Sequence, residues 1–104
     1  MKSRLHEAAD AELTEAVAYY DGKAEGLGDR FLAEVKLASR SIEEYPEIAP
    51  EIEYGVRAKV LHRFPYTLMY VLDEHELFIV AVAHQSRRPG YWADRIPSAT
   101  GDIT

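Results

Sequence analysis

The residues best suited to chemistry lie in one segment, AHQSRRPGYWADR, at positions 83–95. It contains an imidazole (His84), two adjacent guanidinium groups (Arg87 and Arg88) and a phenol (Tyr91). Such groups can take up a proton, surround a phosphate with positive charge and protonate a leaving oxygen. The spacing therefore predicts a catalytic or phosphate-binding group made of these four residues.

The same segment also has a structural interpretation. A histidine that ends a buried strand can hydrogen-bond the following chain to the sheet, and an arginine pair can lie in a solvated loop or pair with acidic helix residues. Tyr91 and Trp92 follow the turn-forming residues Pro89 and Gly90, and are expected to pack over the sheet as a C-terminal clasp. Tyr91 can combine this packing role with a phosphate contact, so both interpretations stay open.

A second group of basic residues lies in the segment VRAKVLHR, at positions 56–63. Alternation along a strand places Arg57, Lys59 and Arg63 on one face and His62 on the other. Such a row could bind RNA, a carboxylate-rich protein tail or only water. We therefore predict Arg57, Lys59, His62 and Arg63, together with Trp92, as residues that bind a substrate or partner, and expect the clasp to hold the first group beside them.

The charge of the chain limits what these cations can bind. The net charge is −6 over 104 residues. Residues 1–56 contain six Lys or Arg against thirteen Asp or Glu, whereas residues 57–95 contain six against four. This basic excess is too small for the roughly six or more phosphate contacts of a tight, non-specific nucleic-acid binder.

Several other classes of site are not expected. The chain has no cysteine, which excludes disulfides and thiolate metal sites. His62, His75 and His84 lack the spacing of a metal site, and there is no Gly-rich phosphate loop, so we expect no metal and no cofactor. An apolar run long enough for a membrane span and an N-terminal signal sequence are both missing, so a cytoplasmic location is expected.

The elements that must position these residues can be read from the hydrophobic period. Residues 2–6 are a candidate edge strand. A helical period over residues 7–22 and again over 31–45 predicts two helices, ended by Gly22 and Pro46 and joined by the glycine-containing turn EGLGD. The period changes to two over residues 56–63, 67–73 and 77–84, which predicts three strands in an antiparallel meander. The last strand is apolar on both faces and is expected at the centre of the sheet.

This order of elements predicts an α+β fold, in which an N-terminal helical hairpin packs on a small, mainly antiparallel β-sheet that carries a C-terminal clasp. We expect a single domain over residues 1–95. Residues 96–104 are expected to form a flexible C-terminal tail.

The chain resembles the RelE/ParE superfamily, which contains toxins of bacterial type II toxin–antitoxin systems (the plasmid stabilisation family). The resemblance covers residues 3–95 and rests on YY and GLGDRF in the hairpin, VR in a strand, RFPY before LMY, and H-x-x-R-x-P-G-Y-W at the end. It implies a toxin that arrests growth when free and is neutralised by a cognate antitoxin. Because such antitoxins are typically acidic and this chain is too, we expect the antitoxin to bind mainly through an apolar helix in a groove.

The resemblance implies two alternative targets. RelE-like members enter the ribosome and cut mRNA without a metal, using basic residues and a tyrosine, whereas ParE-like members inhibit DNA gyrase and lack that catalytic set. Alignment places Thr67 and Gln85 where RelE-like enzymes have arginines, and Tyr91 at the position of the family tyrosine. A ribosome-dependent mRNA endonuclease, a non-enzymatic gyrase inhibitor and a catalytically degenerate member all stay open, and so does the question of whether the chain is an enzyme.

Overall fold

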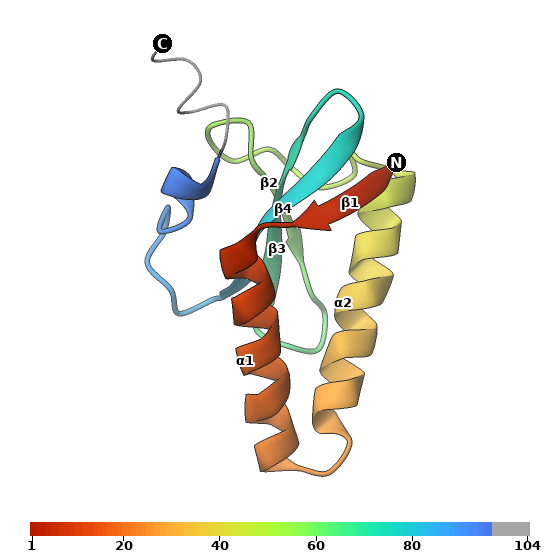
Figure 1. The fold of residues 1–104 in the computed structure, drawn as a ribbon, viewed down its shortest axis with the longest axis vertical. Coiled ribbons are helices and arrows are strands. Elements are labelled where there is room, and N and C mark those ends of the chain that lie inside the picture. Colours follow the sequence, from red (N-terminus) through yellow and green to blue (C-terminus); the bar gives the residue numbers. More distant parts are fainter. Residues whose placement is uncertain (97–104) are drawn as a thin grey trace.

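Two α-helices, a four-stranded sheet and a short 3-10 helix make up residues 1–96 (Figure 1). The structure is a computed structural model, and it describes residues 1–96. In chain order the elements are β1 (Lys2–Leu5), α1 (Glu7–Lys23), α2 (Leu27–Glu44), β2 (Arg57–Val60), β3 (Tyr66–Leu72), β4 (Glu76–His84) and the short 3-10 helix η1 (Ala93–Arg95). The order agrees with the α+β prediction.

The sheet has the strand order β1-β4-β3-β2, which places β4 between two neighbours. β2 pairs with β3 and β3 with β4 in antiparallel fashion, as the meander prediction required. β1 pairs with β4 in parallel and lies at the edge of the sheet. Every residue of β4 from Leu77 to Ala83 is buried, which fits a central strand covered on both faces.

The two helices form an antiparallel hairpin over one face of the sheet (Figure 1). α1 begins after His6, whose side chain accepts a hydrogen bond from the Ala8 N–H, and it continues one residue beyond the predicted end at Gly22. The buried positions of α2 recur at three- and four-residue spacing, which is the pattern of a helix with one apolar face. They are Gly28, Phe31, Val35, Ala38 and Ile42. Tyr45, predicted on the same stripe, caps the helix and is 59% exposed.

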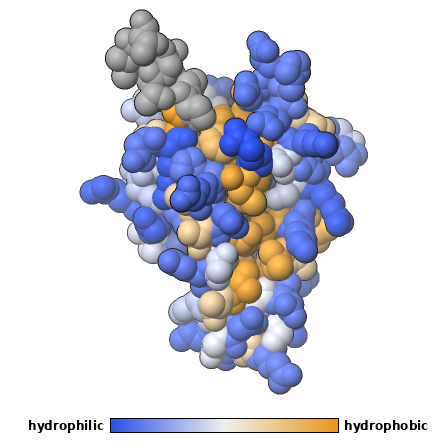
Figure 2. Space-filling model, in the orientation of Figure 1, coloured by the Kyte–Doolittle hydropathy of each residue, from blue (hydrophilic) through white to orange (hydrophobic). Residues whose placement is uncertain are grey.

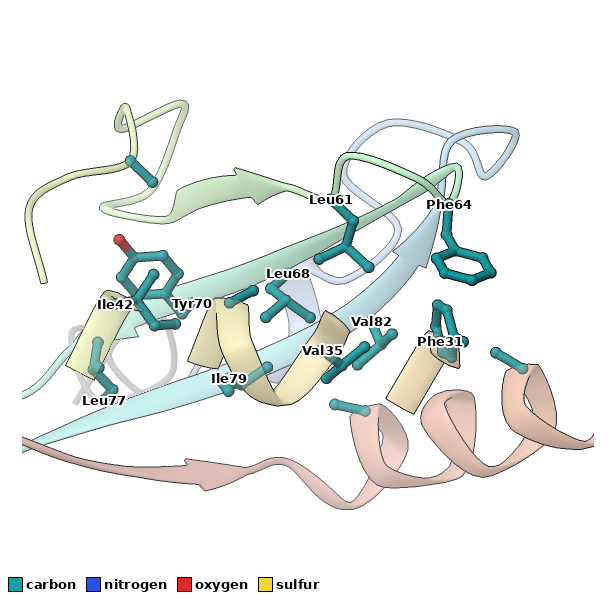
Figure 3. Packing of buried hydrophobic residues seen from close by; sticks show 14 residues of the cluster. Phe31, Val35, Ile42, Leu61, Phe64, Leu68, Tyr70, Leu77, Ile79 and Val82 are labelled. Carbon is teal, nitrogen blue, oxygen red and sulfur yellow. The ribbon is translucent and has the colours of Figure 1, made fainter. Parts of the chain in front are cut away.

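Each face of the sheet has its own hydrophobic core. On the helical side, side chains of α2 point towards those of the sheet, and Phe31 lies opposite Phe64 (Figure 3). Figure 2 shows apolar side chains gathered between the helices, with polar ones on both sides. On the other side, Trp92 and Ile96 pack with Val56, Phe78 and Val80. The C-terminal segment thus covers the second face, which confirms the predicted clasp.

Three sequence-based boundaries need correction. α2 begins at Leu27, so the last three residues of the predicted turn EGLGD belong to the helix that was predicted from residue 31. β2 ends at Val60, so His62 and Arg63 lie in the turn before β3 and Arg63 does not share a strand face with Arg57. Leu61, which the alternation placed on the same face as the cations, is buried from the turn. Ile96, predicted as the first residue of the tail, is 2% exposed and packs in the second core. The remainder of the predicted tail, residues 97–104, lies outside the described residues.

The helical hairpin depends on a close approach at Gly28. A Cβ atom there would lie 2.6 Å from the carbonyl oxygen of Val17 and would also meet the Asp21 side chain. The Asp21 carboxylate in turn accepts a hydrogen bond from the Gly28 N–H at 2.9 Å and so stabilises the first turn of α2. Glycine lets the two helices approach closely enough for this bond to form.

We therefore predict that Gly28→Ala lowers the free energy of unfolding by about 1–2 kcal/mol, because overpacking outweighs the gain in helix propensity. Gly22→Ala is the matched control, since Gly22 also lies in a helix but a Cβ there meets nothing within 4 Å. It should gain about 0.5–1 kcal/mol. Urea unfolding measures both variants, and a shift in the same direction for both would contradict the close approach.

Candidate functional site

The structure brings the predicted C-terminal residues together at the end of β4. A pocket of about 270 Å³ is lined by His84, Arg87, Arg88, Tyr91 and Trp92. Thr67 and Gln85, the residues at the two arginine positions of RelE-like enzymes, line the same pocket. Trp92 is only 2% exposed, so it forms the floor of the clasp and its ring is not available to a partner in this structure.

His84 holds the turn that follows β4. Its Nδ1 atom accepts a hydrogen bond from the Ser86 N–H at 2.9 Å and lies 2.7 Å from the Ser86 hydroxyl oxygen. Its ring also packs edge-on against Tyr66, with the ring centroids 5.1 Å apart. Because Nδ1 accepts a bond from a backbone N–H, the neutral ring carries its proton on Nε2. Before Nε2 could act as a base, the proton would have to move to Nδ1 and break that bond.

Tyr91 is engaged by a carboxylate. Its hydroxyl donates a hydrogen bond to Glu12 Oε2 at 2.7 Å. Burial raises the pKa of the Tyr91 phenol far above its usual value, and the bond to Glu12 and the charge of Glu12 raise it further. A phenol in this state stays protonated, and its proton points at Glu12 instead of into the pocket.

Glu12, on α1, is the functional residue that the sequence did not reveal. It accepts two hydrogen bonds from Arg95, at 3.0 and 3.1 Å, and one from the backbone N–H of Val82 at 3.0 Å. The side chains of Arg95 and Glu12 are 15% and 13% exposed. Glu12 looked like one of several helix carboxylates, and nothing in its local sequence indicates partners 70 to 83 residues away.

Arg87 and Arg88 are the groups that the site leaves free to bind. The Arg87 guanidinium lies 4.0 Å from the centre of the Tyr91 ring, a cation–π arrangement that orients it. Both arginines are exposed, and within residues 1–96 neither forms an ion pair. Their guanidinium edges can therefore bind a carboxylate or a phosphate.

The second predicted group does not lie beside the first. Arg57 donates hydrogen bonds to the carbonyl oxygens of Glu47 and Ala49, so it anchors the loop before β2. Lys59, His62 and Arg63 line a separate groove of about 700 Å³ between α2 and the β2–β3 turn. This groove and the His84 pocket have no lining residue in common.

The groove is mainly apolar. Leu37 on α2 and Val60 on β2 line it and are 62% and 54% exposed. Glu34 on α2 links the two sides of the groove. The Glu34 carboxylate accepts hydrogen bonds from the backbone N–H groups of His62 (2.6 Å) and Arg63 (3.1 Å) in the β2–β3 turn. The predicted row of cations is therefore not one surface. Arg57 anchors the loop before β2, whereas Lys59 and Arg63 line the apolar groove.

Two further observations concern the described part of the chain. Among residues 1–96, no three His, Asp or Glu side chains are grouped so that they could hold a metal ion. None of the helices in this range is long and apolar enough to cross a bilayer.

Comparison with known proteins gives one family and one fold. The model of the family described as "ParE toxin of type II toxin-antitoxin system, parDE" matches residues 4–89. Among solved structures, a chain from the "Chromosomal ParDE TA system from P. aeruginosa" superposes with a TM-score of 0.64 at 16% identity, and the match covers 81% of this chain and 95% of that chain. At this identity the likeness establishes a shared fold. None of the curated proteins matches this sequence.

We predict that Glu12→Gln lowers the free energy of unfolding by about 3 kcal/mol, because Arg95 is left as a buried charge without its counter-ion. Glu15→Gln, an exposed carboxylate on the same helix, should change stability by less than about 0.5 kcal/mol. Chemical denaturation compares the two. Equal, small losses would mean that Glu12 does not hold the clasp.

The raised pKa of Tyr91 makes a second prediction. The stabilisation that comes from its protonated phenol is fully present below the pKa of an unfolded tyrosine, about 10, and is lost as the pH rises above that value. An ultraviolet phenolate titration of the folded protein should therefore give the same curve for the wild type and Tyr91→Phe up to about pH 11. One additional tyrosine ionising near pH 10 in the wild type would contradict the bond to Glu12.

Proposed function

The chain belongs to the ParE toxin family of type II toxin–antitoxin systems, and from this premise we propose that it arrests growth by binding a protein target, DNA gyrase, without cutting RNA. We further propose that a cognate antitoxin neutralises it by occupying the groove between α2 and the β2–β3 turn.

The observation that carries the first proposal is the bond from the Tyr91 hydroxyl to Glu12. Metal-independent RNA cleavage needs a group that takes a proton from the ribose hydroxyl, a group that gives one to the leaving oxygen, and cations around the phosphate. The protonated Tyr91 hydroxyl donates its hydrogen bond to Glu12, and His84 Nδ1 accepts a hydrogen bond from the Ser86 N–H. The arrangement supports binding through Arg87 and Arg88 more than it supports proton transfer.

Arg87 and Arg88 are the proposed target contacts. They are exposed on the loop after β4, and Arg87 is held against the Tyr91 ring. An oriented guanidinium loses less side-chain entropy when it binds than a mobile one does. Two such groups suit a carboxylate-bearing patch on a protein target.

The groove suits the apolar face of an antitoxin helix. Its exposed floor residues, Leu37 and Val60, would be covered by such a helix, which removes apolar surface from water. The toxin carries a charge of −6, so long-range attraction to an acidic antitoxin is not available. Affinity should then depend on apolar contact and vary little with salt.

One pair of assays separates the target alternatives. Purified protein is tested for inhibition of gyrase supercoiling and, in a translating extract, for mRNA cuts mapped by primer extension. We expect inhibited supercoiling and no cuts. Ribosome-dependent cuts that disappear in Tyr91→Phe would instead establish an endonuclease with Tyr91 in its site.

We predict that Arg87→Ala/Arg88→Ala weakens gyrase inhibition by about tenfold or more, since arginines at an interface commonly contribute about 1 kcal/mol each or more. Arg40→Ala, an exposed arginine on α2, is the matched control and should inhibit as the wild type does. Full inhibition by the double variant would rule out this contact surface.

We also predict that Leu37→Glu weakens antitoxin binding by about a hundredfold, because it places a charge in the apolar groove. Calorimetry with the cognate antitoxin measures the loss, and the same variant should still arrest growth when it is expressed alone. Unchanged antitoxin affinity would place the antitoxin elsewhere on the toxin.

A further inference from the structure

A tyrosine occupies a position that local backbone geometry does not favour. Residues 53–56 form a tight turn, closed by the hydrogen bond from the Val56 N–H to the Glu53 carbonyl oxygen at 2.9 Å. Its two central residues, Tyr54 and Gly55, have φ angles of 57° and 75°. Positive φ at both central positions is the pattern of a type I′ turn, where asparagine, aspartate or glycine is preferred first. Tyr54 is the one non-glycine residue with positive φ within residues 1–96.

Packing does not account for this tyrosine either. Tyr54 is 66% exposed, and three other large apolar residues of the loop between α2 and β2 are about half exposed. They are Tyr45, Ile48 and Ile52. We call residues 45–56 the docking loop. Tyr54 thus combines an unfavourable backbone conformation with an exposed aromatic side chain. Both features are typical of functional surfaces.

The docking loop is held firmly to the sheet. Arg57 Nη1 donates to the Ala49 carbonyl oxygen at 2.7 Å, and the Tyr70 hydroxyl donates to that of Pro46, also at 2.7 Å. The Ala58 N–H donates to the Pro50 carbonyl oxygen at 3.1 Å, and Ala49 is buried in the core. The exposed side chains are thus displayed from a fixed backbone, which lowers the entropy lost on binding.

The charge of the docking loop selects the chemistry of its partner. Glutamates alternate with the exposed apolar residues, and residues 45–56 contain three glutamates and no lysine or arginine. Nucleic acid would be repelled by this surface, and an acidic antitoxin gains nothing from it. A protein surface with an apolar centre and a rim of lysines or arginines is complementary to it.

We propose that the docking loop, with Tyr54 at its tip, is a second contact surface for the protein target and receives a basic surface of that target. This inference rests on the proposed function, because an enzyme that handles DNA needs basic surfaces to hold phosphates. The loop also adjoins the other proposed contact. Glu53 Oε1 lies 3.6 Å from the position that a Cβ would take at Gly90, in the clasp that carries Arg87 and Arg88.

The test separates the side chain from the backbone strain. Tyr54→Asn replaces the aromatic ring with a residue that the turn prefers, so its urea midpoint should rise while its affinity for purified DNA gyrase falls about tenfold or more. Tyr54→Phe keeps the ring and should bind as the wild type does. Tyr19→Ser removes a 56% exposed tyrosine from α1 and should leave the affinity unchanged.

The charge of the loop is tested by Glu47→Gln/Glu53→Gln. This variant should associate with gyrase more slowly than the wild type and with a weaker dependence on salt. Glu25→Gln/Asp29→Asn removes two carboxylates at the α1–α2 turn, which lies at the opposite end of the molecule from the docking loop (Figure 1). This control should retain the wild-type association rate and salt dependence.

Each outcome decides between the proposals. Wild-type affinity for gyrase in Tyr54→Asn would overturn the docking loop and leave the proposed function standing. A wild-type protein that neither binds gyrase nor arrests growth would overturn both. A wild-type dimer that becomes monomeric in Tyr54→Asn, with gyrase binding unchanged, would assign the loop to a second copy of this chain and overturn a target contact.

Discussion

The largely buried ion pair between Glu12 and Arg95 is the interaction on which the rest of the structure depends. β1 pairs with β4 only as far as Ile79, and beyond that point no strand within residues 1–96 adjoins the same edge of β4. There Arg95 donates to the carbonyl oxygen of Val80, and the N–H of Val82 donates to Glu12. Two side chains thus replace the missing strand and satisfy backbone groups that would be costly to leave unpaired. They also join α1, the central strand and the C-terminal clasp.

This constraint limits what the neighbouring residues can do. A largely buried arginine needs a carboxylate, and the carboxylate that pairs with it also accepts a hydrogen bond from the Tyr91 hydroxyl. Tyr91 in turn supports Arg87 with its ring. Glu12 and Tyr91 could perform acid–base chemistry by residue type, but here they hold the C-terminal clasp to α1. The groups that remain exposed for binding are the guanidinium groups of Arg87 and Arg88. The same residue set in a chain without Glu12 would leave the phenol available.

The sequence predicted the parts of the fold that rest on local periodicity. In α2, buried residues from Phe31 to Ile42 recur once per helical turn, so the sequence pattern indicates a helix directly. In β4, consecutive buried residues before His84 indicate a strand covered on both faces. The sequence could not predict Glu12, whose partners come from β4 and the clasp. It also placed Arg63 on a strand, although β2 ends at Val60 and Leu61 is buried from the turn that follows. Side-chain contacts between segments far apart in the chain depend on how the helices, the sheet and the clasp pack together. The hydrophobic period of one segment carries no information about that packing.

The position of the groove relative to the docking loop bears on how neutralisation would work. The groove and the docking loop both adjoin β2. Lys59 and Val60 line the groove, and the Ala58 N–H donates a hydrogen bond to the Pro50 carbonyl oxygen in the docking loop. A helix bound along the groove would lie within a few residues of the loop, so its bulk would hinder a large target from reaching Tyr54. The antitoxin would not need to cover Arg87 or Arg88, which line a pocket that shares no residue with the groove. Neutralisation by steric exclusion then requires only that the target engage both contact surfaces at once, since losing one of two linked contacts weakens binding far more than in proportion.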